Sequence, residues 1–261
     1  MEIDWEKVEK LVKPSTSFDF LVKSIKTTLT YNFVRENYNL SMRELQEYTQ
    51  KLLGSDPRQR YNAYLENINS VFRKLEKLDV TDVVDLISLT ENKYKFAEFY
   101  KKSNISLEGL VRVYKYFFNW FLPSKGYLRE LVEKENDDQI EYTTILRKYG
   151  IRFTLDILDR GRTRVMRKKI AVDSGIPEDF ILELVNKADF TRMPYIKGKS
   201  INHYFSIGYN NLEKLSKANL GQLESEMRDY LKKKGIKLSS SFIELDSGIE
   251  IAKILCKLIV D

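Results

Sequence analysis

Residues 146–160, "LRKYGIRFTLDILDR", align with residues 75–89, "LEKLDVTDVVDLISL", at an offset of 71. The alignment continues without a gap to about residue 118, and it preserves the apolar positions of three helical segments. It contains five identities: Leu75 with Leu146, Lys77 with Lys148, Asp85 with Asp156, Ser103 with Ser174, and Ile105 with Ile176. Five identities are few, so chance agreement is the alternative, but the preserved spacing favours an internal duplication.

The spacing of apolar residues and the capping signals favour helices throughout. The chain of 261 residues has only 11 glycines and 5 prolines, which is typical of helical rather than turn-rich β proteins. The segment "SMRE" at 41–44 predicts a capping box, and "DPRQ" at 56–59 predicts the first turn of another helix. Asn219, with Gln222 three residues later, predicts the start of a late helix. The expected fold class is all-α, with tandem helix-hairpin-helix-like modules and an N-terminal helical region.

Three regions are expected from these patterns. Residues 1–70 form an N-terminal helical region, residues 71–130 a degenerate helical repeat, and residues 140–261 a helix-hairpin-helix-like domain. The aromatic run 114–121 is expected in the core or in a subunit interface, because it is too dense for an exposed base-stacking surface. The pair Asp137 and Asp138 is expected in a loop.

The positive charge of the chain is concentrated in one segment. The net charge is +6, yet residues 144–169 have nine basic and two acidic residues, which leaves the rest of the chain near neutrality. These basic residues are Arg147, Lys148, Arg152, Arg160, Arg162, Arg164, Arg167, Lys168 and Lys169. In a helix over 163–174, three of them (Arg164, Arg167 and Lys168) share an arc of about 100°. Arg160 and Arg162 extend this stripe into the preceding turn. Such a stripe suits phosphate binding, and the alternative is a solvated helix face.

A second candidate site lies in "FTRMPYIKGKSINHYFSIGYNNLEKLSKA", residues 190–218. A tight turn at Tyr195–Gly198 leads into a short helix, and a further helix capped by Asn210 follows. Glycine permits close backbone approach, and a helix N-terminus favours an anion, so Lys197, Gly198 and Lys199 are candidates for phosphate binding. An ordinary turn between packed helices is the alternative.

At these residues the chain resembles the domain of unknown function 4332 family, which is related to helix-hairpin-helix modules. The matching stretches are "YGIRFTLDIL", "RGRTRVMRKKIAVDSGIPEDFILELVNKADFTRM", "GYNNLEKLSKANLGQL" and "GIEIAKIL". The resemblance covers about residues 144–255, with a degenerate earlier copy at 72–118. It implies compact helical modules without catalytic residues, nucleic-acid binding through the hairpins, and a structural role for Arg167 in holding a neighbouring carbonyl. The chain departs from the usual Gly-hydrophobic-Gly hairpin, since Gly198 is preceded by Tyr195, Ile196 and Lys197.

Other residues argue against several function classes. The single Cys256 excludes an internal disulfide and is expected in the core, and the lone His203 excludes a multi-histidine metal site. No phosphate-binding loop, dinucleotide fingerprint or nucleophile elbow occurs, so neither an enzyme nor a cofactor or metal site is expected. The start of the chain has no apolar signal segment and no run is long enough to span a membrane, so a cytoplasmic location is expected.

Two functions are consistent with these features of the sequence. The first is a nucleic-acid-binding protein that contacts backbone phosphates with little sequence readout, with DNA expected rather than RNA. The second is a scaffold that docks an acidic protein through the same basic stripe. The oligomeric state stays open.

Overall fold

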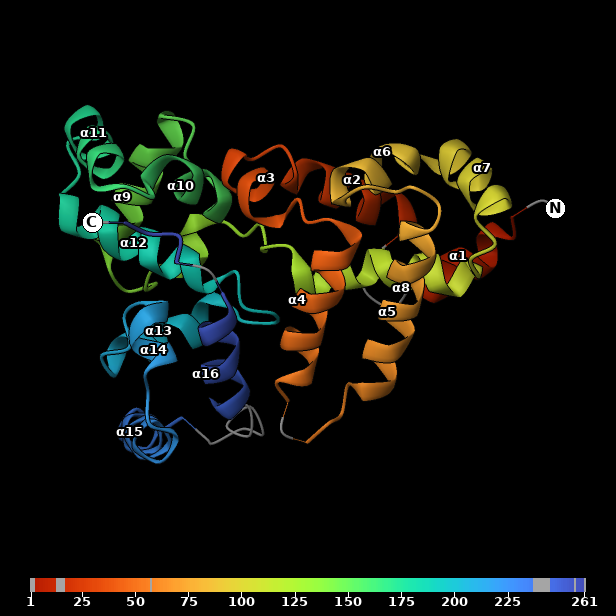
Figure 1. Cartoon of the computed structure of the whole chain (residues 1–261). Helices are drawn as coiled ribbons and strands as arrows, with labels where there is room; N and C mark the ends of the chain where they lie inside the picture. Colours follow the sequence, from red (N-terminus) through yellow and green to blue (C-terminus); the bar gives the residue numbers. More distant parts are fainter. Residues whose placement is uncertain (1–2, 13–16, 57, 237–244, 256, 261) are drawn as a thin grey trace. The chain divides into compact units, whose positions relative to one another are not determined.

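The computed structural model describes residues 3–12, 17–56, 58–236, 245–255 and 257–260, and their regular structure is helical (Figure 1). No strand occurs in these ranges, which contain only isolated β-bridges. The expected all-α fold class is confirmed. The chain divides into two compact units, Met1–Pro123 and Ser124–Asp261, called unit 1 and unit 2 below. The expected boundaries at residues 70 and 140 stay predictions about subdivision, and Cys256 lies outside the described residues.

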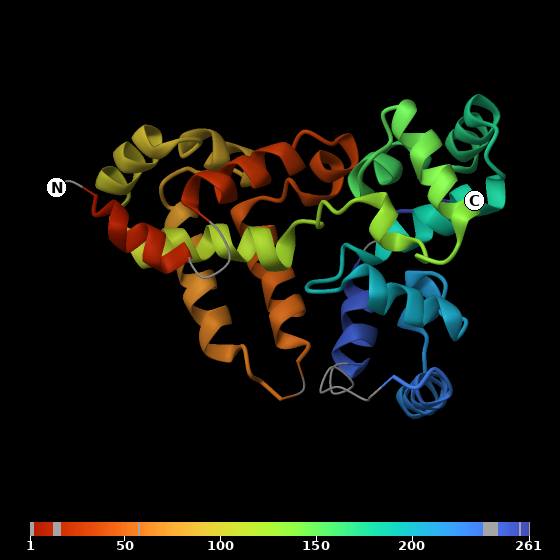
Figure 2. The ribbon, with the colours of Figure 1, turned by 180° about the vertical axis from the view of Figure 1, so that it is seen from behind.

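Unit 1 contains eight described α-helices and one π-helical turn at the end of the last of them. They are α1 (Trp5–Val12), α2 (Phe18–Thr28), α3 (Asn32–Tyr38), α4 (Met42–Gly54), α5 (Asn62–Glu76), α6 (Val83–Leu89), α7 (Lys93–Ser103), α8 (Leu107–Tyr116) and η1 (Phe117–Phe121). Helices α4 and α5 run side by side, and α8 packs against α1, α2 and α5 (Figures 1 and 2). The N-terminal helices therefore share one core with the region of the first repeat.

The aromatic run at the end of α8 lies in this core, as the sequence predicted. Tyr114, Tyr116, Phe117 and Phe121 are all buried. The Tyr116 hydroxyl is 2.7 Å from the Thr49 hydroxyl on α4, which gives the buried phenol a hydrogen-bond partner. The run therefore serves packing rather than base stacking.

Two predicted helix starts had different outcomes. The capping box at Ser41 is confirmed, since its hydroxyl accepts from the Glu44 N–H and the Glu44 carboxylate accepts from the Ser41 N–H. The predicted helix start at Asp56 is wrong, because the helix begins at Asn62. Gln59 has a φ of 54°, which a right-handed helix cannot accommodate, and the buried Asp56 carboxylate accepts hydrogen bonds from Arg58 and Arg60 instead.

Unit 2 contains eight described α-helices and one 3₁₀ turn. They are η2 (Leu128–Leu131), α9 (Asp137–Lys148), α10 (Thr154–Gly161), α11 (Arg164–Ser174), α12 (Glu178–Phe190), α13 (Gly198–Ser206), α14 (Leu212–Ser216), α15 (Leu220–Lys233) and α16 (Leu245–Ile254). The expectation of a loop at Asp137 and Asp138 is wrong: both lie in the first turn of α9, where carboxylates favour the positive end of the helix dipole.

The core of unit 2 is centred on α12, which packs on α10, α11 and α13. Gly161 at the end of α10 permits the close contact, because a Cβ there would stand 2.7 Å from the Val185 Cγ2 atom of α12. The N-cap of α14 is Asn211 rather than the predicted Asn210. Asn219 caps α15 as its position predicted.

Helix boundaries in the two units follow the sequence offset. Helices α6, α7 and α8 begin 71 residues before α10, α11 and α12. The capping contacts also correspond: Asp85 accepts from the Thr81 N–H at 2.9 Å, and Asp156 accepts from the Arg152 N–H at 2.8 Å. Whether the two segments superpose in space stays a prediction.

Candidate nucleic-acid interface

Helix α11 presents the exposed part of the basic stripe. Thr163 caps the helix by accepting from the Met166 N–H, and Gly175 ends it with a φ of 70°. Arg164, Lys168 and Lys169 are exposed on it. Arg164 lies 3.9 Å from the Glu178 carboxylate, at the limit of an ion pair. Within the described ranges, Lys168 and Lys169 have no carboxylate in ion-pair contact, so their ammonium groups remain available to an anion.

Arg167 does not contribute to this exposed surface. Its side chain is buried, with 2% of its area exposed. Its guanidinium donates to three carbonyl oxygens, those of Gly161 at 3.3 Å, Arg162 at 3.1 Å and Val260 at 3.2 Å. It thereby joins the turn between α10 and α11 to the end of the chain. Arg167 therefore has the carbonyl-holding role that the family resemblance implied. Its buried guanidinium is not exposed to a phosphate.

Arg160 and Arg162 lie at the turn that precedes α11. The Arg160 guanidinium donates to the Tyr149 carbonyl at 2.8 Å and is otherwise exposed, so it borders the stripe while holding the end of α9. The Arg162 side chain is half-buried. Its carbonyl accepts from the Val260 N–H at 2.8 Å, and Thr163 forms a parallel bridge with Val260. These two arginines therefore have structural contacts in addition to their charge.

Gly198 has a packing role that explains the glycine without a ligand. It is the first residue of α13, and a Cβ at this position would stand 2.0 Å from the Glu130 carbonyl oxygen of η2. The close approach that glycine permits is therefore made by the protein's own backbone. The preceding turn includes Tyr195 at a φ of 62°. This packing favours the ordinary-turn interpretation of the hairpin over phosphate binding at Gly198.

The lysines beside this glycine remain exposed. Lys197 and Lys199 both lie at the surface of the α13 N-terminus. The pKa of His203 on the same helix lies below its usual value, because its ring is partly buried and because the Lys199 charge is near. The His203 ring packs 5.5 Å from the Tyr230 ring of α15, centroid to centroid. His203 is thus a packing residue.

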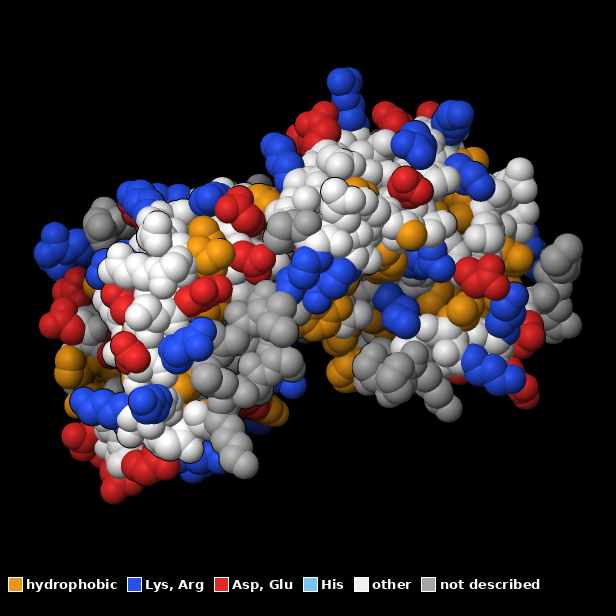
Figure 3. Space-filling view, turned by 90° about the horizontal axis from the view of Figure 1, so that it is seen from below, with side chains coloured by type: hydrophobic (Ala, Val, Ile, Leu, Met, Phe, Trp, Pro, Cys, Tyr) orange, Lys and Arg blue, Asp and Glu red, His pale blue; other side chains and the backbone are white. Residues whose placement is uncertain are grey.

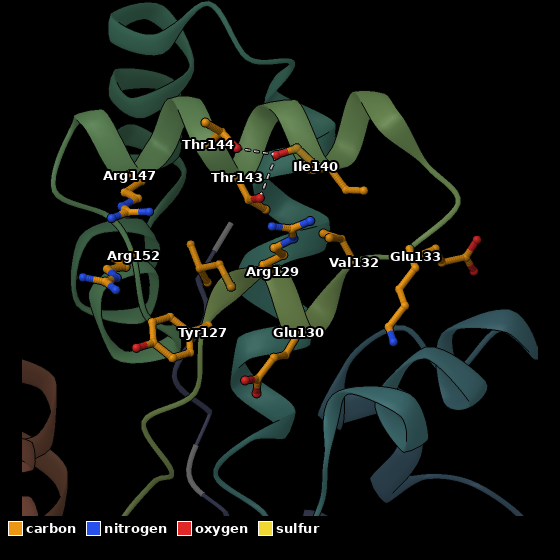
Figure 4. Close-up of a pocket in the computed structure, with 12 residues that line it drawn as sticks. Tyr127, Arg129, Glu130, Val132, Glu133, Ile140, Thr143, Thr144, Arg147 and Arg152 are labelled. Atoms are coloured by element: carbon orange, nitrogen blue, oxygen red, sulfur yellow. Dashed lines mark hydrogen bonds between the residues drawn. The ribbon is translucent and has the colours of Figure 1, made fainter.

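A cavity of unit 2 brings together residues that the sequence did not group. It has a volume of about 610 Å³ and lies between α9, η2 and the turn before α10 (Figure 4). Arg129, Arg147 and Arg152 line it, together with Tyr127. Arg147 and Arg152 belong to the basic segment 144–169, so its charge gave a partial signal. Arg129 comes from η2, and no sequence pattern singled it out.

Opposite charges alternate elsewhere on the molecule. On the face in Figure 3, Lys and Arg side chains are interspersed with Asp and Glu side chains. In the described part of the chain, no group of three His, Cys, Asp or Glu side chains has the geometry of a metal site. No described helix is long and apolar enough to span a membrane.

One family model matches part of unit 2. Residues 139–253 match the model of a family described as a domain of unknown function (DUF4332). The resemblance inferred from the sequence is therefore confirmed for this segment, which includes most of α9, α10 to α15 and most of α16. No curated protein and no solved structure matches the chain. The relation to helix-hairpin-helix modules and the earlier degenerate copy stay predictions.

Proposed function

We propose that this chain is a non-enzymatic nucleic-acid-binding protein that contacts backbone phosphates through a basic surface of unit 2. The observation that carries the proposal is the exposed pair Lys168 and Lys169 on α11, which has no carboxylate partner among the described residues. Arg164 on the same helix, and Lys197 and Lys199 at the start of α13, are the other exposed cations assigned to binding.

The charge distribution supports binding to the phosphate backbone rather than to base edges. The chain is close to neutral outside residues 144–169, so its positive field is local. Lysine ammonium groups are point charges that attract any phosphate regardless of the adjacent base. We therefore expect little sequence preference, with duplex DNA as the first ligand to test and the cytoplasm as the location.

The arrangement of α12, α13 and α14 supports a distant relation to helix-hairpin-helix modules. A long helix is followed by a tight turn, in which Tyr195 has a left-handed φ, and by two short helices. We infer a degenerate hairpin, in which Gly198 serves packing and the binding surface has moved to α11. The matching helix starts support a second degenerate copy in unit 1.

The experiment is a titration against duplex DNA at several salt concentrations. The variant Lys168→Glu with Lys169→Glu should weaken binding to all sequences alike. It should also reduce the slope of log affinity against log salt by about 1.8, because each phosphate neutralised adds about 0.9. The fold should be unchanged, since surface substitutions usually alter the free energy of unfolding by within about 0.5 kcal/mol.

A matched control is available on the corresponding helix of unit 1. Lys101 and Lys102 are adjacent, exposed and located in the last turn of α7. Changing both to Glu alters the net charge by the same amount without touching α11. If this control weakens binding as much as the α11 variant, the effect is one of net charge and the assigned surface is wrong. If the parent protein binds no nucleic acid at low salt, the proposed function is wrong.

Docking of an acidic protein is the second candidate, and one observation favours it. Val165 and Val172 are 79% and 83% exposed on α11, beside Lys168 and Lys169. Exposed apolar side chains gain more from a protein surface than from phosphates. Changing both valines to serine should leave nucleic-acid binding intact. A protein partner, by contrast, should bind the serine variant more weakly.

A further inference from the structure

The cavity of unit 2 differs in character from the exposed stripe on α11. It is concave, its volume of about 610 Å³ lies within the range of small-ligand pockets, and it is lined by four basic and two acidic side chains. Besides the three arginines, the charged residues are Lys134, Glu130 and Glu133. The two carboxylates point away from Arg147 (Figure 4). In this view Arg147 and Arg152 lie on one side of the cavity and Glu133 lies on the other.

Two of the guanidinium groups, those of Arg129 and Arg147, are available to an anion. In the described ranges, the side chains of Arg129 and Arg147 have neither an ion pair with a carboxylate nor a hydrogen bond to a protein acceptor. Each comes from a different element, η2 and α9, and the fold brings both to the same cavity. Guanidinium groups bind phosphate through paired N–H donors, so two of them facing one cavity suit a phosphate group.

An aromatic wall adjoins these arginines. Tyr127 is 46% exposed, and the Arg152 guanidinium carbon lies 5.1 Å from the centre of its ring. The Phe153 ring packs on Tyr127 at 5.0 Å between centroids. Backbone hydrogen bonds hold this wall, with the Leu128 N–H donating to the Arg152 carbonyl at 3.1 Å. A flat ring can stack on such a wall, because both aromatic rings and guanidinium planes stack with bases.

From this juxtaposition we propose that the cavity binds one unpaired nucleotide of a single-stranded nucleic acid. Arg129 and Arg147 bind its phosphate, and its base lies against Tyr127 and Arg152. This inference rests on the proposed function and extends it, since a base can enter a cavity only when it is not paired. The stripe on α11 binds either form of the strand, while the cavity discriminates in favour of single strands.

The test compares a single-stranded oligothymidylate of about ten nucleotides with duplex DNA of the same length. The double variant Arg129→Gln with Arg147→Gln should lose about 10-fold or more in affinity for the single strand, because charge-assisted hydrogen bonds are lost. Its affinity for the duplex should stay unchanged. Tyr127→Ala should weaken single-strand binding alone. Equal weakening of single-strand and duplex binding by either variant would show no preference for an unpaired nucleotide.

The control is Lys232→Gln with Lys233→Gln at the end of α15, which removes the same charge from exposed positions outside the cavity. It should bind both forms like the parent. If the cavity variant also binds the single strand like the parent, the inference is overturned.

A second titration separates failure of this inference from failure of the proposed function. Thymidine monophosphate and inorganic phosphate are added to the full chain, and the NMR resonances of Tyr127 and Thr144 are followed. The monophosphate should shift them at lower concentration than phosphate does. Equal responses would remove the base contact from the inference. If the parent binds the free nucleotide but no strand, a free nucleotide is the occupant and the single-strand assignment is overturned. If neither small molecule shifts the resonances, the cavity is not a nucleotide site.

Discussion

The Arg167 guanidinium and the Val260 carbonyl oxygen lie 3.2 Å apart, although 93 residues separate them in the chain. The same nitrogen contacts the carbonyl oxygens of Gly161 and Arg162. A buried cation thus satisfies backbone acceptors from two distant segments. This contact shows why one arginine of the basic segment belongs to the core, while its neighbour Lys168 is exposed.

Replacement of Arg167 by methionine should destabilise unit 2 by about 2–4 kcal/mol. Methionine keeps the apolar stem but removes the donor of the Gly161 and Val260 carbonyl oxygens, while the Arg162 carbonyl keeps the Val260 N–H. Buried groups that lose their partner are costly. Urea unfolding followed by circular dichroism measures the change. Lys168→Met is the adjacent control and should lie within about 0.5 kcal/mol of the parent. Equal stability of the two variants would contradict the structural role of Arg167.

Gly198→Ala should also destabilise the protein, by about 2 kcal/mol or more. The added Cβ would stand 2.0 Å from the Glu130 carbonyl oxygen, so η2 or α13 must move. Gly221→Ala on α15 is a matched control, because a Cβ there meets no atom closer than 3.5 Å. This control should stabilise the helix by several tenths of a kcal/mol. A thermal melt that ranks the two variants the other way would contradict the close packing of Gly198 on the Glu130 carbonyl.

The two corresponding aspartates should have similar energetic roles. Asp85 and Asp156 each occupy the third position of their helices, and each accepts hydrogen bonds from the preceding turn. Asp→Ala at either site should cost about 1 kcal/mol, as is typical when a helix loses a capping contact. Chemical denaturation of both variants tests the correspondence. A cost at one site and none at the other would weaken the duplication, as would an experimental structure in which 72–118 and 143–189 fail to superpose.

Stability should fall on acidification, partly because of His203. Its folded-state pKa lies below the usual 6.5, because of burial and the nearby Lys199. The unfolded chain therefore binds a proton more readily than the folded chain. The contribution of neutral His203 to stability is fully present above pH 6.5 and is lost as the pH falls from there through the folded-state pKa. Denaturation midpoints at about pH 7.5 and about pH 5.5 should differ less in His203→Gln than in the parent. An identical pH dependence would exclude this contribution.

A fragment of residues 124–261 should fold by itself. Unit 2 has its own core, and contacts at its start include the Ser124 N–H with the Thr191 carbonyl and the Gly126 N–H with the Thr154 hydroxyl. A shorter fragment beginning at residue 132 lacks η2 and so lacks the backbone that packs on Gly198. It should be less stable in circular dichroism melts. An unfolded 124–261 fragment would contradict the division into two units.

The sequence alone determined the class of fold and some helix starts. These features depend on residues within one turn of each other, so they are visible in a local pattern. Ser41 and Asn219 cap the helices that their spacing predicted. The resemblance to the family was also visible in the residues, and residues 139–253 match its model. The concentration of positive charge in residues 144–169 is visible from a count of the basic and acidic residues.

Tertiary structure decided which of those charges can meet a ligand. The helical period places Arg167 beside Lys168 on one arc. No local sequence pattern predicts that the segment at Val260 covers Arg167 and leaves Lys168 exposed. Likewise, Gly198 faces Glu130, and Arg129 faces the same cavity as Arg147, only because segments distant in sequence meet. Periodicity gives the direction of a side chain around its own helix, whereas burial depends on what packs against that direction.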